Sequence, residues 1–363
     1  MDTNGKTARI VSGSHPSQED LRAAAEVVEK GGLVVFPTET VYGLGANSLM
    51  EDAVSRIFEV KGRPPSLPLT YHLSSVAAAG PLIKNLSETG KKLMQSFLPG
   101  PLTLVFEKSD NVPDLITGGG RKVGIRVPSH PLALEFLKTV KVPLVATSAN
   151  ISGRPSSTTL SHIIKDLGDK VDLILDAGDS PLGIESTVLD VTTEPPRLIR
   201  SGYITQEEIA RVIGRMPLLS DDHIGMPKLP RFTPSARIII VEGEGAALVA
   251  RLQNLADEHR KSGKVVMVIS EESLGFLEDR YSDENVSLRV MGSRGNYHGI
   301  ALNLFRMLRD LEDEEISTVL VEGVPREGLG VSIMDRLARA AHEAGTGDGQ
   351  RRIKSEPEGG RIS

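Results

Sequence analysis

The sequence of 363 residues contains no cysteine and no tryptophan, and aromatic residues make up only 4% of it. Without cysteine the chain can form no disulfide, no thiolate metal site and no cysteine nucleophile. With so few aromatic rings, a platform that stacks nucleic-acid bases is not expected. No run approaches the roughly 20 apolar residues that a transmembrane helix needs. The opening M-D-T-N-G-K-T-A-R lacks the apolar core of a secretory signal. We therefore expect a cytoplasmic protein without membrane contact.

A strong excess of charge of one sign is also missing. The formal net charge is −6, and residues 1–215 hold 23 Lys and Arg against 24 Asp and Glu. Proteins that bind nucleic acid through bulk charge usually show a clear basic excess. The balance argues against such a protein, although it leaves room for a local basic pocket. The length predicts about two domains.

Short apolar segments alternate with helical patterns over residues 1–215. Helical spacing follows Ser17, a typical N-cap residue, and a second helix is predicted from Glu51 to Lys61. Gly62 and the prolines after it fit the end of that helix. Further helices are predicted near 87–97, 131–140, 158–167 and 205–214. Strands are predicted at L-V-V-F, L-T-Y-H-L, L-T-L-V-F, V-G-I-R-V, L-V-A-T, L-I-L-D and T-V-L-D-V. The mixed order predicts an α/β sheet with some antiparallel pairing.

The second half of the chain begins with a change of composition. Residues 216–236 contain four prolines in 21 residues without periodicity, which predicts an extended linker or lid. From 237 to 344 the pattern runs strand, helix, strand, and this order predicts a smaller, Rossmann-like parallel α/β domain. The tail at 345–363 is rich in glycine and charge, and we expect it to be disordered.

The common phosphate and metal motifs are absent from the sequence. There is no G-x-x-x-x-G-K-[ST] loop and no H-E-x-x-H pair, so we assign no metal-ligating residue. The glycines at 43–48 and at 243–248 each fall one short of a dinucleotide fingerprint. The second set follows a predicted strand and indicates a tight strand-to-helix turn.

Polar loops follow several of the predicted strands. They are P-T-E-T-V-Y-G (37–43), G-G-G-R-K (118–122), A-T-S-A-N-I-S-G-R-P-S (146–156), G-I-E-S-T-V-L-D (183–190) and L-I-R-S-G (198–202). Each loop alone is more often a turn or a cap. K-G-R-P-P at 61–65 has two interpretations, a helix end or a pair of cations that holds a phosphate. Together the loops favour a shared polar cleft.

Five motifs follow one another along the chain: P-T-E-T-V-Y-G-L-G-A-N, K-G-R-P with P-L and His72, S-A-N-I-S-G, E-S-T-V and I-R-S-G. In this order they resemble the YrdC family of threonylcarbamoyl-AMP synthases. N-L-F-R-M-L-R-D-L and G-L-G-V-S-I-M-D-R-L-A-R-A-A resemble the C-terminal domain of the long, two-domain form. The resemblance covers about residues 15–344. It implies a twisted mixed sheet with a concave cleft, followed by the smaller α/β domain.

The resemblance also implies a reaction. The family is a nucleotidyltransferase family that makes L-threonylcarbamoyladenylate from L-threonine, bicarbonate and ATP, with release of pyrophosphate. The product feeds the tRNA threonylcarbamoyl transferase machinery, which modifies adenosine 37 in tRNAs that read codons beginning with A. Mg²⁺ is expected with ATP, and direct tRNA contact stays open. The threonine carbamate attacks the α-phosphorus, so no protein nucleophile is needed.

The resemblance assigns residues to both substrates, motif by motif. For L-threonine they are Thr40, His72, Arg126, Ala146 through its backbone, and Ser186. For ATP they are Lys61, Arg63, Leu67, Lys122, Ser148, Asn150, Ser156, Arg200 and Arg231. Of these, Lys61 and Arg63 are also assigned the catalytic role at the phosphates.

Two positions depart from the family pattern. Leu67 stands where the family usually has Asn in K-G-R-P-x-x-N-P-L, so a side-chain contact is lost or replaced by backbone. R-F-T-P at 231–234 stands where the long form usually has H-Y-A-P, and Arg231 brings a fixed charge in place of a histidine. An RNA-binding module that uses the same basic cleft without nucleotide turnover is the alternative function.

Overall fold

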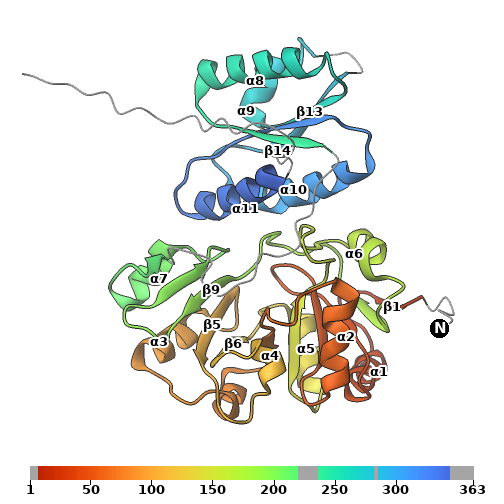
Figure 1. The fold of residues 1–363 in the computed structure, drawn as a ribbon, viewed down its shortest axis with the longest axis vertical. Helices are drawn as coiled ribbons and strands as arrows, with labels where there is room; N and C mark the ends of the chain where they lie inside the picture. The colour runs from red at the N-terminus through yellow and green to blue at the C-terminus, as the bar shows by residue number, and fades with distance from the viewer. Residues whose placement is uncertain (1–6, 220–235, 282–284, 344–363) are drawn as a thin grey trace, which may run out of the picture.

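The computed structural model describes residues 7–219, 236–281 and 285–343. Within these ranges the strands form two separate sheets (Figure 1). One has eleven strands in the order β1-β8-β2-β3-β7-β4-β6-β5-β9-β10-β11, and the other has four in the order β12-β15-β13-β14. The larger sheet mixes parallel pairs such as β4 with β6 and antiparallel pairs such as β2 with β3. The smaller sheet is parallel in every pair. The predicted fold class is confirmed.

The larger sheet and its helices occupy the first part of the chain. Its strands are β1 (Arg9–Ser12), β2 (Val34–Phe36), β3 (Gly43–Asn47), β4 (Thr70–His72), β5 (Leu102–Glu107), β6 (Lys122–Arg126), β7 (Leu144–Ser148), β8 (Leu173–Asp176), β9 (Thr187–Asp190), β10 (Arg197–Arg200) and β11 (Leu218–Leu219). Its helices are α1 (Gln18–Glu29), α2 (Glu51–Lys61), the 3-10 helix η1 (Val76–Leu82), α3 (Glu88–Phe97), α4 (Asp114–Thr117), α5 (Pro131–Thr139), α6 (Leu160–Leu167) and α7 (Gln206–Ile213).

The smaller sheet is built from the second part of the chain. Its strands are β12 (Arg237–Val241), β13 (Val265–Ser270), β14 (Val286–Gly292) and β15 (Thr318–Glu322). Its helices are α8 (Gly245–His259), α9 (Glu271–Leu277), α10 (Tyr297–Asp310), the 3-10 helix η2 (Leu311–Asp313) and α11 (Leu329–Glu343). The turn after β12 leads directly into α8, as the glycines at 243–248 indicate.

The predicted ends of the first two helices are confirmed by their caps. The Ser17 hydroxyl accepts a hydrogen bond from the backbone N–H of Asp20, as an N-cap does. Helix α2 ends at Lys61 because Gly62 adopts the left-handed conformation, with φ 59°, and closes the last turn. The helix-end interpretation of K-G-R-P-P is therefore correct.

One strand was not predicted from the sequence. The glycines at 43–47, which fall short of a dinucleotide fingerprint, form the buried strand β3. This strand lies between β2 and β7, so it has neighbours on both edges. A Cβ on Gly43 would lie 2.9 Å from the Phe36 ring and one on Gly45 3.0 Å from the Leu144 side chain. Glycine at these two positions therefore allows the Phe36 and Leu144 side chains to pack closely against the strand.

Helices cover both faces of each sheet. In the larger sheet, α1 and α5 bury one face, and α2, α3, α6 and α7 contribute to the core on the other. In the smaller sheet, α8 and α9 cover one face and α10 and α11 the other. Figure 1 shows α10 and α11 between the smaller sheet and the larger domain. These two helices thus form the junction of the domains.

Some predictions fall on residues that the structure does not describe. The predicted linker at 216–236 begins with the short strand β11, which pairs with β10, and residues 220–235 lie outside the described ranges. The predicted disordered tail at 345–363 lies outside them as well. The domain boundaries stay a prediction. In the described part of the chain, no helix is both long enough and apolar enough to cross a bilayer.

Candidate active site

The loop between β2 and β3 carries three buried polar side chains, Thr38, Glu39 and Thr40. The Thr38 hydroxyl donates to the backbone oxygen of Val41 at 2.6 Å and lies 2.9 Å from the Thr40 hydroxyl. These bonds hold the loop in a tight turn of the kind that threonine favours. The turn fixes the positions of the Glu39 carboxylate and the Thr40 hydroxyl.

Arg126, the last residue of β6, points at this loop. Its Nη2 donates to Glu39 Oε1 at 2.9 Å and to Thr40 Oγ1 at 2.7 Å. The Arg126 and Glu39 side chains are only 6% and 7% exposed, so each buried charge is stabilised by its pairing with the other. The Nε of Arg126 is buried and has no hydrogen-bond partner among the described residues. A buried guanidinium with a spare donor is suited to a small carboxylate.

His72, the last residue of β4, lies beside Arg126 in the strand register. Its Nδ1 is 3.2 Å from the Thr70 carbonyl oxygen, which can only accept, so the network places the proton on Nδ1. Burial lowers the pKa of His72 to about 3, and the nearby Arg126 adds to this effect. His72 is therefore neutral near pH 7, and its Nε2 can accept a hydrogen bond.

Lys61 ends α2 and is buried. Its Nζ donates to the carbonyl oxygens of Ser148 and Asn150, both at 2.5 Å. Burial lowers the pKa of Lys61 well below its usual range, and the neighbouring Arg63 lowers it further. These two hydrogen bonds connect the end of α2 to the loop that follows β7.

Arg63 and Leu67 lie on the segment that follows α2. Arg63 Nη2 donates to the Pro68 carbonyl at 2.9 Å, and its Nε is buried without a partner in the described chain. Burial lowers the pKa of Arg63 to about 10, so it keeps its charge at neutral pH. The Leu67 side chain is 1% exposed. Its backbone N–H donates to the Pro64 carbonyl at 3.0 Å, and a contact of Leu67 with ATP stays a prediction.

Two of the remaining nucleotide residues, Ser156 and Arg200, lie beside Glu185. The Ser156 hydroxyl donates to Glu185 Oε1 at 3.0 Å. Arg200 Nη2 donates to the carbonyl oxygen of Ser186 at 2.8 Å and to its hydroxyl at 3.1 Å. Burial lowers the pKa of Arg200 to about 9, although the Glu185 carboxylate opposes that shift. Asn150 donates to the Arg154 carbonyl at 2.7 Å, and its Oδ1 is buried with no partner in the described residues.

The structure does not draw every predicted residue into this cluster. Lys122 begins β6, roughly 13 Å along the strand from Arg126, and its ammonium pairs with Asp190 at 2.6 Å. The Ala146 side chain lies in the core, so only its backbone faces neighbouring strands. Arg231 lies outside the described residues. The substrate roles of all the predicted site residues stay predictions.

Three carboxylates that contact the predicted residues were not assigned from the sequence. They are Glu39, Glu185 and Asp190, which contact Arg126, Ser156 and Lys122. Glu39 and Glu185 stand inside the quoted P-T-E-T and E-S-T-V motifs, where a carboxylate among hydroxyls is a visible signal. Their arginine partners are 87 and 151 residues away in the chain, and no local pattern gives that pairing.

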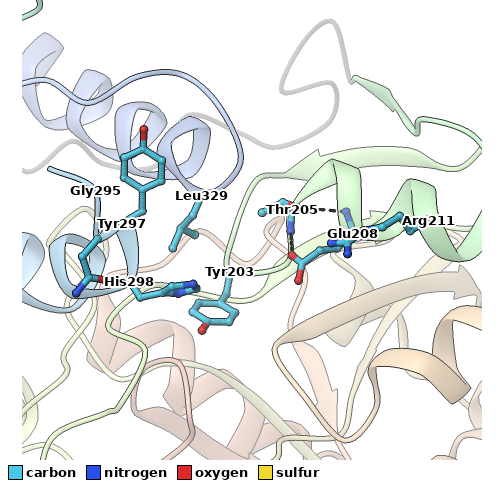
Figure 2. Close-up of a pocket in the computed structure, with 9 residues that line it drawn as sticks. Tyr203, Thr205, Glu208, Arg211, Gly295, Tyr297, His298 and Leu329 are labelled. Atoms are coloured by element: carbon cyan, nitrogen blue, oxygen red, sulfur yellow. Dashed lines mark hydrogen bonds between the residues drawn. The ribbon is translucent and has the colours of Figure 1, made fainter. Parts of the chain in front are cut away.

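One concavity borders this cluster at His72, and another is lined by other residues. The first, of about 270 Å³, opens beside His72 and is lined mainly by apolar residues of η1, α5 and the start of β7. The other, of about 350 Å³, lies between the domains and is shown in Figure 2. There the Tyr203 and His298 rings face each other at 5.2 Å, one from each domain. None of the predicted site residues that the structure describes lines the second concavity.

Comparison with known proteins places this geometry in a family. The Sua5, YciO and YrdC family model, described as telomere recombination, matches residues 26–202, and the model of the threonylcarbamoyl-AMP synthase C-terminal domain matches 204–342. The threonylcarbamoyl-AMP synthase of Pyrococcus abyssi is 40% identical, and the match covers 88% of this chain and 94% of that protein. The chain belongs to the threonylcarbamoyl-AMP synthase family. The Bacillus subtilis synthase is 37% identical, with 88% and 92% covered.

Solved structures agree over both domains of the synthase. The crystal structure of the P. abyssi Sua5 protein complexed with L-threonine superposes with a TM-score of 0.84 at 37% identity, and covers 93% of this chain and 98% of that one. The Escherichia coli YciO structure matches 54% of this chain, with a TM-score of 0.50 at 27% identity. The chain is thus a two-domain, nucleotidyltransferase-type enzyme, as its motifs predict.

Proposed function

We propose that this synthase makes L-threonylcarbamoyladenylate from L-threonine, bicarbonate and ATP, and releases pyrophosphate. The observation that carries the proposal is the buried Arg126, with a spare Nε donor, between the Thr40 hydroxyl and the neutral His72. This cluster offers a cation for a carboxylate and acceptors for an ammonium or hydroxyl. An amino acid with a hydroxyl side chain presents all three groups.

In this proposal the Arg126 guanidinium binds the threonine carboxylate. Since the pKa of His72 is about 3, its Nε2 is too weak a base to hold the ammonium proton near pH 7. His72 therefore orients the amine as a hydrogen-bond acceptor. The ammonium first gives up a proton to solvent, and the free amine then attacks the carbon of bicarbonate. A C–N bond forms, a C–O bond of bicarbonate breaks, its hydroxide leaves as water with a proton from the amine, and the product is a carbamate. The L-threonine complex of the P. abyssi protein supports this substrate.

The second step joins the carbamate to ATP. A carbamate oxygen attacks the α-phosphorus, the bond to the β-phosphate oxygen breaks, and pyrophosphate leaves with both electrons. We place the nucleotide along the loop at 148–156, with Arg63 and Arg200 beside the phosphates. Alignment of bound reactants can supply roughly 7–11 kcal/mol of the barrier. The cations offset charge that develops on the leaving pyrophosphate.

Mg²⁺ is proposed to enter with ATP, where it neutralises charge on the phosphates. Mg²⁺ usually keeps several waters and binds substrate phosphates with one or two carboxylates. Two carboxylates of the cluster, Glu39 and Glu185, already pair with arginines. The phosphates and water are therefore its proposed ligands. The product would pass to the tRNA threonylcarbamoyl transferase machinery in the cytoplasm. The alternative, an RNA-binding module without turnover, is not favoured by the family.

The test is pyrophosphate release by the full chain with ATP, bicarbonate and L-threonine, with the adenylate product identified by mass. We expect release to require both threonine and bicarbonate. Arg126→Lys keeps the charge but loses the planar fork, so the KM for threonine should rise about tenfold or more. Arg121→Lys, at an exposed position just before β6, is the control and should change nothing. Threonine-independent release would overturn the proposal.

A further inference from the structure

The second domain reaches the proposed nucleotide site through helices α10 and α11. Each helix contributes an arginine that binds a carboxylate of the first domain beside this site, Arg309 to Asp166 and Arg336 to Glu185. Both carboxylates contact the loop at 148–156, which carries Asn150 and Ser156.

Arg309 is buried in the first domain although it belongs to α10. Its Nη2 lies 2.6 Å from Asp166 Oδ2, and its Nη1 donates to the Pro155 carbonyl at 2.5 Å. Asp166 also accepts from the backbone N–H of Ile151 at 3.1 Å and from Arg154 at 2.6 Å. Burial raises the pKa of Asp166, but Arg309 and Arg154 hold it below its usual value, so it stays charged. Arg309 thus contacts the segment at 151–155 at both ends, directly at Pro155 and through Asp166 at Ile151.

Arg336 holds the other side of the same loop. Its Nε donates to Glu185 Oε2 at 2.8 Å, and the second oxygen of that carboxylate accepts from Ser156. Burial raises the pKa of Glu185, but Arg336 and Arg200 lower it to about 2. The carboxylate therefore stays ionised at neutral pH and joins α11, Ser156 and Arg200 in one network.

The surrounding contacts leave the two domains little room to move apart. Ile184, next to Glu185, is fully buried in the core of the second domain. A Cβ on Gly183 would lie 2.5 Å from the Leu302 Cα of α10, so the backbones are in close contact. The Ser332 hydroxyl of α11 donates to the Gly202 carbonyl at 2.7 Å. The arginines are therefore presented by a fixed interface.

We infer that Arg309 and Arg336 are positioning residues for ATP, and that the second domain contributes to the reaction by holding the loop at 148–156 in its binding shape. The inference rests on the proposed function, which places ATP at that loop. Neither arginine needs to contact the nucleotide. Loss of either pairing would free one side of the loop and weaken ATP binding. Arg126, Thr40 and His72 of the threonine cluster lie on different elements, and only Ser186, next to Glu185, is beside the Arg336 contact.

The experiment uses the full chain with Arg309→Gln, Arg309→Lys, Arg336→Gln and Arg336→Lys. The control is Arg306→Gln, which removes an exposed interdomain pair with Asp179 from the same helix without a contact to the loop. Calorimetry measures ATP and threonine affinity separately, and steady-state assays measure the KM for each. Because Arg309 is buried, its variants can lose stability, and the more accessible Arg336 then keeps the test valid.

We expect the Gln variants to weaken ATP binding roughly tenfold, a typical shift for residues outside a ligand site. Threonine affinity should stay within about twofold, and the Lys variants should recover part of the loss because they keep a charge. Equal loss for both substrates, or an ATP affinity like that of Arg306→Gln, would overturn the inference. ATP binding without threonine-dependent turnover in the wild type would overturn the proposed function alone.

Discussion

At the residue scale, the protonation state of His72 links the site to stability. Its pKa is about 3 in the folded chain against about 6.5 in an unfolded one. Between these values the unfolded chain binds a proton that the folded chain does not. The free energy of unfolding therefore falls as the pH drops from about 6.5 toward 3, by up to about 1.4 kcal/mol per pH unit for this group.

We predict that His72→Gln flattens the dependence of stability on pH in that window and leaves it unchanged above pH 6.5. Glutamine can still donate to the Thr70 carbonyl and accept a second hydrogen bond, so the fold should persist. Denaturant unfolding at several pH values measures the effect. Burial also lowers the pKa of His130 and His162, so some slope should remain. If the free energy of unfolding of the variant changed with pH as steeply as that of the wild type, protonation of His72 would not be the cause of the pH dependence.

At the scale of single elements, two glycines end helices in the same backbone conformation but in different surroundings. Gly62 ends α2 with φ 59°, and Gly118 ends α4 with φ 60°. A Cβ on Gly62 would meet nothing within 4 Å, whereas one on Gly118 would lie 2.3 Å from the Ser66 carbonyl oxygen. Ser66 belongs to the segment after α2 that carries Arg63.

We predict that Gly62→Ala costs about 1–2 kcal/mol of stability through backbone strain alone. Gly118→Ala should cost more and should also raise the KM for ATP, because the segment at 63–69 has to move. Urea unfolding gives the stability of both variants, and pyrophosphate release gives the KM. The same stability loss in both, with unchanged KM values, would contradict the role of the Ser66 contact.

Local signals explain which elements the sequence predicts well. Helix α2 is predicted to the residue because both its apolar spacing and its glycine stop are local. The strand β3 is missed because G-L-G-A-N lacks the β-branched residues and the alternation that mark a strand. Its buried place between β2 and β7 comes from contacts across the sheet, which no short window of sequence contains.

At the scale of the whole molecule, the two domains are predictable but their junction is not. The shift to a proline-rich composition after residue 215 and the change in strand order indicate a second domain. That the E-S-T-V motif sits against the second domain follows from packing alone. Ile184 is a single apolar residue in a polar loop, and such a residue does not by itself predict a contact with another domain. The hydrogen bonds of Lys61 to the Ser148 and Asn150 carbonyls are also contacts across the fold that no local pattern gives, and its phosphate contact stays a prediction.

At the junction of the domains, the Ile184 side chain joins the loop of the first domain to the core of the second. Ile184→Ala removes side-chain atoms from the core of the second domain and should lower stability by about 2–5 kcal/mol. Because the same loop carries Glu185, the variant should also weaken ATP binding. The control is Leu252→Ala on α8, which is equally buried but covers the far face of the smaller sheet (Figure 1). It should destabilise without changing ATP affinity. Calorimetric unfolding and ATP titration compare the two, and an equal effect on ATP would show that stability, rather than the interface, sets the affinity.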